Sequence, residues 1–145
     1  MLIEIRNQAF DPWQEISRYQ ENCGLVPGSY GACATFVGTL RDFNQGDKVK
    51  RMRLTHYPGM TEHQLSKIAE QALSQYQLLD LIIVHRVGDI NPNEPIVLVA
   101  VWSAHRAAAF DGCRQIMEYL KSSATFWKKE TLESEQRWVS SGVNQ

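Results

Sequence analysis

Two apolar runs in the second half of the chain constrain its fold more than any other feature. They cover residues 78–84 and 96–102, and each has the length of a strand, well short of the roughly 20 apolar residues that a membrane-spanning helix requires. A turn-rich segment, residues 88–95, separates them. We therefore expect two buried strands, at residues 79–86 and 96–104, which pair as an antiparallel hairpin.

Three segments carry the signals of helices. Asp11 is expected to be the N-cap of a first helix, followed by a proline at the first helical position, and this helix should end near Glu21. Thr61 is expected to cap a second helix, in which apolar residues recur with the i, i+3, i+4 spacing of a helix that lies on a sheet. A third amphipathic helix is predicted over residues 106–122.

The remaining segments alternate between strands and loops. Further strands are predicted at residues 2–6, 31–39, 49–57 and 126–129, with a last short strand at Trp138-Val139. Residues 41–48 are read as a polar loop that joins the strands 31–39 and 49–57 into a second hairpin. This order lacks the strict strand–helix alternation of a doubly wound sheet. We expect a single α+β domain over residues 1–145, with a mainly antiparallel sheet, flanking helices and a loose tail after about residue 139.

Composition excludes some classes of function. A net charge of −1 does not favour a dedicated nucleic-acid binder, which is usually basic, and no segment is apolar enough to span a membrane. Cys23, Cys33 and Cys113 form neither a CxxC pair nor a zinc-binding spacing. We expect them to be small buried residues in a reducing cytoplasm, with a catalytic cysteine as the alternative.

Cationic residues gather around the third predicted helix. His105 and Arg106 open it directly after a strand, where free N–H groups and the positive end of the helix dipole favour an anion. Lys121 lies near its end, and Lys128 and Lys129 follow in the next strand. Strand alternation should turn one of these two lysines inward, where burial lowers its pKa as a catalytic lysine needs. Ordinary capping and solvated charges remain the alternative for each residue.

Helix geometry separates two of these groups. Arg106 and Lys121 are 15 positions apart in the sequence, which corresponds to about 22 Å at the rise of an α-helix. They cannot both touch one small substrate within a single subunit unless the helix is broken. Either two separate sites exist, or one subunit supplies His105 and Arg106 while another supplies the lysines. Arg41, just beyond the strand 31–39, either reaches a ligand or is solvated.

Five sequence blocks, in this order, resemble the catalytic (large) subunit family of molybdopterin synthase over about residues 3–138. They are Gly31-Ala32 with Phe36-Val37-Gly38-Thr39-Leu40-Arg41, His56-Tyr57-Pro58-Gly59-Met60, His85-Arg86-Val87-Gly88, His105-Arg106, and Leu120-Lys121 with Phe126-Trp127-Lys128-Lys129-Glu130. The resemblance implies an α/β hammerhead fold and a homodimer of large subunits. A small ubiquitin-like partner would bind at each end, which makes a heterotetramer.

The resemblance also implies a reaction in molybdenum cofactor biosynthesis. Sulfur would pass from a thiocarboxylate on the partner's C-terminal Gly-Gly to cyclic pyranopterin monophosphate, forming the dithiolene of molybdopterin. Lys121 and Lys128 would be catalytic. The substrate-binding positions carried over from the family are Thr39, Leu40, Arg41, His105, Arg106, Lys121, Lys128, Lys129 and Glu130. No metal and no other cofactor is implied. Thr125 stands where the family often has a proline. The threonine in place of proline is expected to loosen the turn before Lys128.

Two other classes of function stay open. A non-catalytic anion-binding or adaptor module with a basic patch would tolerate arginine in place of Lys121. A nucleic-acid binder would use Phe126 and Trp127 as stacking residues, and its affinity would fall steeply with salt.

Overall fold

The computed structural model describes residues 1–22, 24–132 and 135–139. The chain has a mixed α+β fold, as expected, and none of its described helices is long and apolar enough to cross a membrane. The elements, in chain order, are β1 (Leu2–Arg6), α1 (Pro12–Asn22), β2 (Ala32–Thr39), β3 (Phe43–Asn44), β4 (Asp47–His56), α2 (Met60–Gln75), β5 (Asp80–Arg86), β6 (Gly88–Ile90), β7 (Pro95–Ser103), α3 (Arg106–Ser122), β8 (Phe126–Leu132) and β9 (Gln136–Val139).

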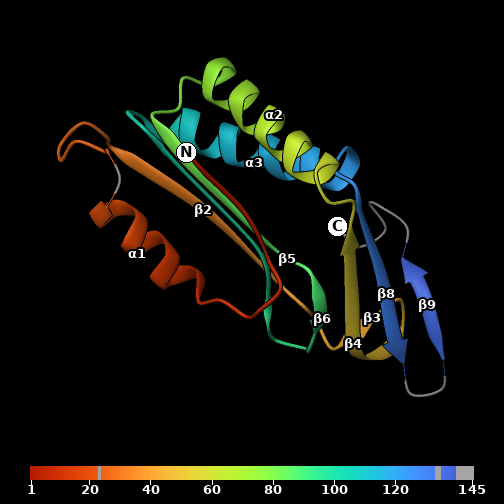
Figure 1. Cartoon of the computed structure of the whole chain (residues 1–145). Helices are drawn as coiled ribbons and strands as arrows, with labels where there is room; N and C mark the ends of the chain where they lie inside the picture. The colour runs from red at the N-terminus through yellow and green to blue at the C-terminus, as the bar shows by residue number, and fades with distance from the viewer. Residues whose placement is uncertain (23, 133–134, 140–145) are drawn as a thin grey trace.

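The first sheet has the strand order β1-β5-β7-β2. β5 and β7 pair antiparallel, which confirms the expected hairpin of the two apolar runs. β2 is antiparallel to the other side of β7, whereas β1 runs parallel to β5. Helix α1 covers one face of this sheet, and α2 and α3 cover the other (Figure 1). Two-sided burial explains why β5 and β7 are nearly continuous apolar runs.

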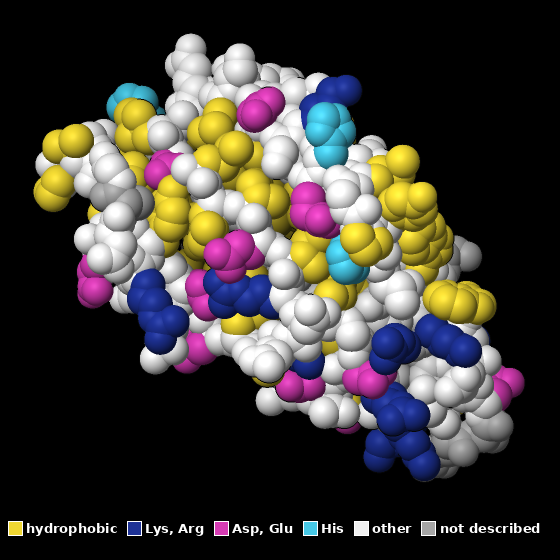
Figure 2. Space-filling view, in the orientation of Figure 1, with side chains coloured by type: hydrophobic (Ala, Val, Ile, Leu, Met, Phe, Trp, Pro, Cys, Tyr) yellow, Lys and Arg dark blue, Asp and Glu magenta, His cyan; other side chains and the backbone are white. Residues whose placement is uncertain are grey.

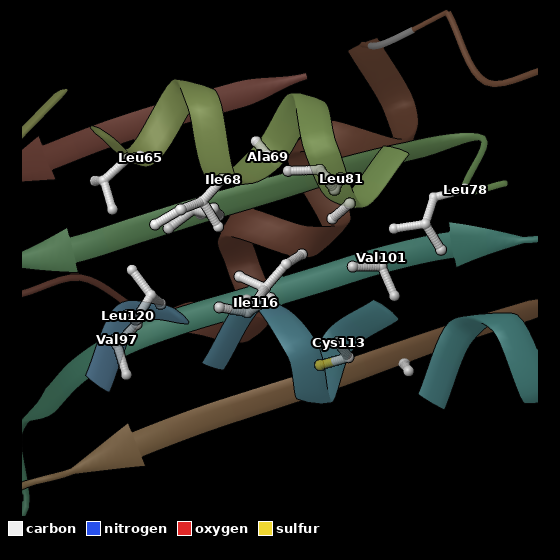
Figure 3. Packing of buried hydrophobic residues seen from close by; sticks show 14 of the residues in the cluster. Leu65, Ile68, Ala69, Leu78, Leu81, Val97, Val101, Cys113, Ile116 and Leu120 are labelled. Atoms are coloured by element: carbon white, nitrogen blue, oxygen red, sulfur yellow. The ribbon is translucent and has the colours of Figure 1, made fainter. Parts of the chain in front are cut away.

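Each face of the central hairpin has its own core. Leu81 of β5 packs beneath α2 and α3 (Figure 3), and Ile83 belongs to the same cluster. Ile82 and Val84 face the residues packed under α1. Helix α3 approaches closely at Gly112, where an added Cβ would lie 2.9 Å from the Leu78 side chain. The absence of a Cβ at Gly112 lets α3 pack directly against Leu78, which precedes β5.

The second sheet has the order β3-β4-β8-β9, with β6 also paired to β4 (Figure 1). The expected hairpin between residues 31–39 and 49–57 is therefore wrong, because β2 pairs with β7 along its length and β4 pairs with β8. The backbone of Leu40 shows why the chain turns away after β2. Leu40 N donates to the Glu94 carbonyl, and Leu40 O accepts from Asn93 N. The chain therefore stays paired with the segment that precedes β7 and does not turn back onto β2, and β4 forms part of the second sheet.

Several element boundaries also differ from those expected. The predicted polar loop 41–48 contains a tight hairpin between β3 and β4, in which Gln45 and Gly46 both have positive φ (53° and 83°), as in a type I′ turn. The predicted loop 88–95 contains the short strand β6. Strand β8 runs to Leu132, beyond the expected end at residue 129. The last short strand is confirmed as β9, and the tail after residue 139 lies outside the described residues.

Thr61 is not the cap of α2. The N-cap is Gly59, at φ 86°, whose N–H is bound by the Glu62 side chain at 2.9 Å. Thr61 is buried in the first turn, where its hydroxyl accepts from Tyr57 N at 3.0 Å and contacts both the carbonyl and the hydroxyl of Thr125, at 3.0 and 2.8 Å. Gln64 Oε1 accepts from the N–H and the hydroxyl of Thr125, at 2.9 and 2.8 Å.

These hydrogen bonds hold the turn that joins α3 to β8. Phe126 N donates to Ala124 O at 3.0 Å across Thr125, which defines a γ-turn. A proline at this position would restrict the turn through its fixed φ. Here Thr61 and Gln64 of α2 restrict it through side-chain hydrogen bonds, and the turn sets how the end of α3 and the start of β8 face each other.

Replacing Thr61 by valine should test this network. Valine keeps the shape but leaves Tyr57 N and the Thr125 carbonyl without their partner, at a cost of about 1–3 kcal/mol in the free energy of unfolding. Urea denaturation measures this cost. The control is Thr35→Val on the exposed part of β2, which should change stability by less than about 0.5 kcal/mol. Equal effects of the two changes would contradict the assigned role.

Candidate active site

A cavity of about 220 Å³ lies where the end of α3 meets β2 and the second sheet. Apolar residues of four strands and α3 form much of its wall: Phe36, Met52, Ile96, Val97, Met117, Leu120 and Phe126. Its polar groups are Thr39, Arg41, Asn44, His85, Lys121, Lys128 and Glu130. Lys and Arg side chains also gather on the outside of the molecule at the end formed by the second sheet (Figure 2). The cavity is thus an apolar pocket that carries a few cationic groups.

The structure brings most of the predicted site residues to this cavity and leaves others elsewhere. Thr39, Leu40, Arg41, Lys121, Lys128 and Glu130 line it. His105 and Arg106 are exposed at the opposite end of α3 from Lys121, and the separation of about 22 Å follows from the helix rise. His105 is the N-cap of α3 but makes no side-chain capping hydrogen bond. The described subunit alone therefore does not unite the two cationic groups.

Lys128 is the inward-facing lysine of β8, as strand alternation predicted. Burial, and after it the neighbouring charge of Lys121, lower the pKa of Lys128 to about 8, while Glu130 acts in the opposite direction. Lys129 faces the other way and does not line the cavity. Its Nζ lies 5.6 Å from the ring centroid of Trp138, in a cation–π contact on the outer face of the sheet.

Lys121 occupies the last turn of α3, where a cation interacts favourably with the helix dipole. It lies one turn after Met117, and both residues line the cavity. Lys121 and Lys128 approach from different elements, α3 and β8, on either side of the turn held by Thr125. The positive charge of Lys121 is close enough to lower the pKa of Lys128.

Glu130 is a buried carboxylate on the wall of the cavity that binds residues of neighbouring strands. Its side chain is 2% exposed, and its Oε1 accepts from Asn44 Nδ2 at 2.5 Å and lies 3.8 Å from Arg137 Nε. Arg137 also binds Asp47 and the Asn44 carbonyl, at 2.9 and 2.8 Å. The Glu130 carboxylate therefore joins β8, β9 and the β3–β4 hairpin around the cavity. Sequence reasoning missed Asn44 and Arg137, because nothing local links either residue to position 130.

His85 also belongs to the cavity, although the sequence analysis names it only within one block of the resemblance and gives it no role. It is buried at the end of β5 and lines the cavity. Its ring stacks on Phe126, with 3.8 Å between centroids and 13° between planes, and its Nδ1 lies 2.9 Å from the Arg86 carbonyl. Burial, together with the charges of nearby Lys128, His56 and Lys121, lowers the pKa of His85 to about 4. The imidazole is therefore neutral at physiological pH.

The stacking of Phe126 on His85 also bears on the nucleic-acid alternative. Trp127 is exposed on the outer face of β8, whereas Phe126 is partly buried on the inner face. The two aromatic residues thus lie on opposite sides of the sheet and cannot form one stacking platform. This arrangement disfavours the nucleic-acid hypothesis.

The cysteines agree only in part with their expected burial. Cys113 is buried in α3, and burial raises the pKa of its thiol to about 11, so it is not a thiolate at neutral pH. Cys33 is exposed on β2, which contradicts the expectation, because β2 is the edge strand of the first sheet. Cys23 lies outside the described residues. Within the described ranges, His, Cys, Asp and Glu side chains form no group of three that is placed to hold a metal ion.

The arrangement has a clear chemical capability. An amine whose pKa is about 8 can both give and accept a proton near neutral pH. A second amine beside it adds positive charge that attracts and stabilises an anion in a partly desolvated cavity. Arg41, exposed at the rim, adds a planar guanidinium suited to phosphate or carboxylate oxygens. The site fits acid–base or group-transfer chemistry on an anionic substrate.

Known proteins that are similar to this chain belong to one family. Residues 5–123 match the model of the MoaE protein family. A protein of Pseudomonas aeruginosa named molybdopterin synthase catalytic subunit is 50% identical over 96% of this chain and 90% of its own length. The solved structure of a molybdopterin biosynthesis MoaE protein from Burkholderia ambifaria has a TM-score of 0.79 and 43% identity, covering 99% of this chain and 92% of that one.

A more distant solved structure shares the fold. It is described as the protein–protein complex of subunits 1 and 2 of the molybdopterin-converting factor from Helicobacter pylori, and the matched chain has a TM-score of 0.78 at 19% identity, covering 96% of this chain and 90% of that one. The family match spans most of the chain, and the relative from Pseudomonas aeruginosa aligns over nearly all of it. The chain therefore belongs to the MoaE protein family.

Proposed function

We infer that this chain is the catalytic subunit of a molybdopterin synthase, a sulfurtransferase of molybdenum cofactor biosynthesis. The observation that carries this function is the pair of amines, Lys121 and Lys128, in one partly apolar cavity, with the pKa of Lys128 lowered to about 8. The curated relative in Pseudomonas aeruginosa carries the name of this catalytic subunit. We take residues 1–145 as one domain and propose a cytoplasmic location, in keeping with cysteines that show no pairing pattern.

The sulfur donor in this proposal is a small ubiquitin-like partner that ends in a Gly-Gly thiocarboxylate. A thiocarboxylate is an anion on a thin, flexible tail, and the cavity offers two cationic amines within apolar walls. The Helicobacter pylori structure is of a complex between two subunits, which supports a partner of this kind. Because the donor brings the sulfur, this chain needs no sulfur-carrying cysteine, in keeping with the raised pKa of the Cys113 thiol.

The acceptor is cyclic pyranopterin monophosphate, whose cyclic phosphate is the anion to be held. We propose that Arg41, His105 and Arg106 bind this phosphate, with Thr39 and Leu40 at the cavity wall. Lys121 and Lys128 would handle the thiocarboxylate and transfer protons as sulfur adds and the phosphate ring opens. Glu130 would act by holding Lys128 and the hairpin in place, since Asn44 and Arg137 already engage its Oε1. Lys129 is carried over from the resemblance alone.

The exposed position of His105 and Arg106 favours a site shared between two copies of the chain. These residues lie at the opposite end of α3 from the lysines, about 22 Å apart by helix rise. In a homodimer, one subunit can supply His105 and Arg106 to the cavity of the other. With one partner protein at each end, the assembly becomes a heterotetramer.

Lys121→Arg distinguishes a chemical role from simple attraction of anions. Arginine keeps the charge but does not deprotonate in this pH range. Loss of a general acid–base group costs about 10²–10⁴-fold in rate, and we expect a loss of that size while partner binding stays within about tenfold, or 1.4 kcal/mol. Single-turnover formation of molybdopterin with saturating thiocarboxylated partner measures it. Near-normal turnover would limit Lys121 to the attraction of anions and leave Lys128 as the better candidate for the acid–base role.

Mixed dimers test the shared site. Arg106→Ala and Lys121→Ala chains should each be inactive alone, and mixing them should restore part of the activity, because one of the two shared sites in the mixed dimer then keeps both groups intact. The assay is molybdopterin formation after subunit exchange, which mass spectrometry of the intact dimer verifies. If exchange is complete and activity stays absent, the site lies within one chain.

Lys128→Met should stabilise the protein while abolishing sulfur transfer. At pH 7 the amine is protonated both folded and unfolded, and folding must bury its charge; methionine removes this cost, on the order of 1–2 kcal/mol. Between the folded pKa of about 8 and the ordinary lysine pKa of 10.5, the unfolded state binds more protons, so wild-type stability rises with pH. The advantage of methionine should therefore shrink from pH 7 to pH 9.5.

Urea unfolding at the two pH values measures this difference. Lys67→Met on the exposed face of α2 is the matched control and should change stability by less than about 0.5 kcal/mol at either pH. A Lys128→Met chain that is less stable than wild type at pH 7 would show that burial of the lysine is not costly.

A further inference from the structure

Strand β2 leaves one edge of the first sheet unpaired. It pairs with β7 on one side, and no strand among the described residues pairs with it on the other. Its register with β7 is regular from Ala32 to Gly38, and its sequence contains neither a charged residue nor a proline. Proteins usually protect a free edge with charge, proline or a covering segment, because an unprotected edge pairs readily with another chain. The β2 edge is therefore a candidate interaction surface.

An exposed apolar patch adjoins this edge. Phe36 of β2 is 40% exposed and Phe110 of α3 is 67% exposed. Phe110 is two helical turns before Met117, so both point to the same side of α3, and Met117 lines the cavity together with Phe36. The other side of α3 faces α2, where Tyr76 Oη donates to Gln115 Oε1 at 3.3 Å. Phe110 therefore projects on the β2 side of α3, away from α2.

Helix α3 runs along β2 in the same direction. At their starts, Gly31 N donates to the Ser103 carbonyl at 3.0 Å, just before β2 and α3 begin. In the middle, Cys113 lies against the backbone of Phe36. At their ends, both elements reach the cavity. Helix α3 therefore covers β7 and β2, whereas α2 lies over β1 and β5 (Figure 3).

A two-fold axis through the middle of β2 exchanges the ends of both elements. The ends of β2 are about 23 Å apart at the rise of a strand, which nearly equals the separation of Arg106 and Lys121 along α3, about 22 Å. The midpoint of that helical span falls next to Cys113, which lies against Phe36, close to the midpoint of β2. Antiparallel pairing of two β2 strands therefore brings Arg106 of one copy beside Lys121 of the other.

The spacing of the helices agrees with this pairing. Because α3 lies over β7 and β2, the α3 helices of two joined copies are about two strand spacings apart, or about 10 Å. Helices in proteins pack with about 8–10 Å between their axes. Phe110 projects into the space between the two helices and becomes buried there. The pairing thus covers both the free backbone edge and the exposed aromatic ring.

We propose that the β2 edge and Phe110 form the interface with a second copy of this chain, in which the two β2 strands pair antiparallel and make one continuous sheet. Each copy then presents His105 and Arg106 at the cavity of the other. That delivery to the cavity rests on the proposed function, whereas the strand pairing does not. The same patch is used on both copies, as a two-fold dimer requires.

Phe110→Arg tests the interface. The side chain is 67% exposed in the single chain, so the fold should tolerate the change, whereas in the dimer two arginines would replace two buried rings. We expect the dissociation constant of the dimer to rise at least about 100-fold. Trp13→Arg is the matched control, because Trp13 is 64% exposed but belongs to α1, on the opposite face of the sheet (Figure 1). It should leave the dimer intact.

Sedimentation velocity over a concentration series measures the dissociation, and circular dichroism verifies the fold. Wild type and Trp13→Arg should sediment as dimers, and Phe110→Arg as a monomer. If Phe110→Arg does not fold, Phe110→Ala should still weaken the dimer at least about tenfold. A monomeric wild type, or a folded Phe110 variant that dimerises as tightly as wild type, overturns the proposal.

Amide hydrogen exchange tests the strand pairing itself. In an edge strand about half of the amides point away from the sheet, and pairing with a second strand protects them. Residues 32–39 should exchange slowly throughout in wild type and Trp13→Arg, and about half of their amides should become fast in Phe110→Arg. A wild-type dimer in which half of these amides exchange fast would reject pairing through β2.

Activity separates this interface from the proposed function. Phe110 does not line the cavity, yet Phe110→Arg should lose most single-turnover molybdopterin formation at concentrations where it is monomeric, because His105 and Arg106 no longer reach another copy. A wild type that dimerises through β2 but forms no molybdopterin would retain the interface and reject the proposed function. An active wild type whose Phe110→Arg chain stays dimeric and active would reject the interface and leave the proposed function intact.

Discussion

The antiparallel pairing of β5 with β7 is the constraint on which the rest of the structure depends. Both strands are buried on both faces, so helices must cover each side of the sheet and further strands must pair at each edge. Helix α1 takes one face, α2 and α3 take the other, and β1 and β2 take the edges. The hairpin also defines the end of the sheet at which the cavity forms.

Each wall of the cavity follows from this scaffold. His85 is near the end of β5, and β2 leads into Thr39 and Arg41 beside the end of β7. Packing of α3 over the sheet brings Lys121 to the same place, and the turn at Thr125 returns the chain as β8 with Lys128. The site is therefore assembled from segments distant in sequence, each held by backbone pairing or by buried contacts.

The positive charges of the two lysines in the cavity lower the stability of the folded protein and favour proton transfer near neutral pH. Two amines close together in a partly buried space cost folding free energy, because each charge is desolvated and each repels the other. Glu130 offsets part of this cost for Lys128, and the neutral ring of His85 avoids adding a third positive charge. The result is an amine that changes protonation close to neutral pH, which few unperturbed side chains can do.

Features that follow from local residue patterns and from strand alternation could be predicted from the sequence. It predicted the helices, the β5–β7 hairpin, the inward orientation of Lys128, and, through the five blocks of the resemblance, the family. Three features depend on distant partners and became visible only in the folded chain: the pairing of β4 with β8 in place of β2, the contacts of Asn44 and Arg137 with Glu130, and the stacking of His85 on Phe126. The physical reason is that hydrogen-bond and packing partners far apart in the chain leave no periodic signal in the sequence, so three-dimensional packing alone selects them.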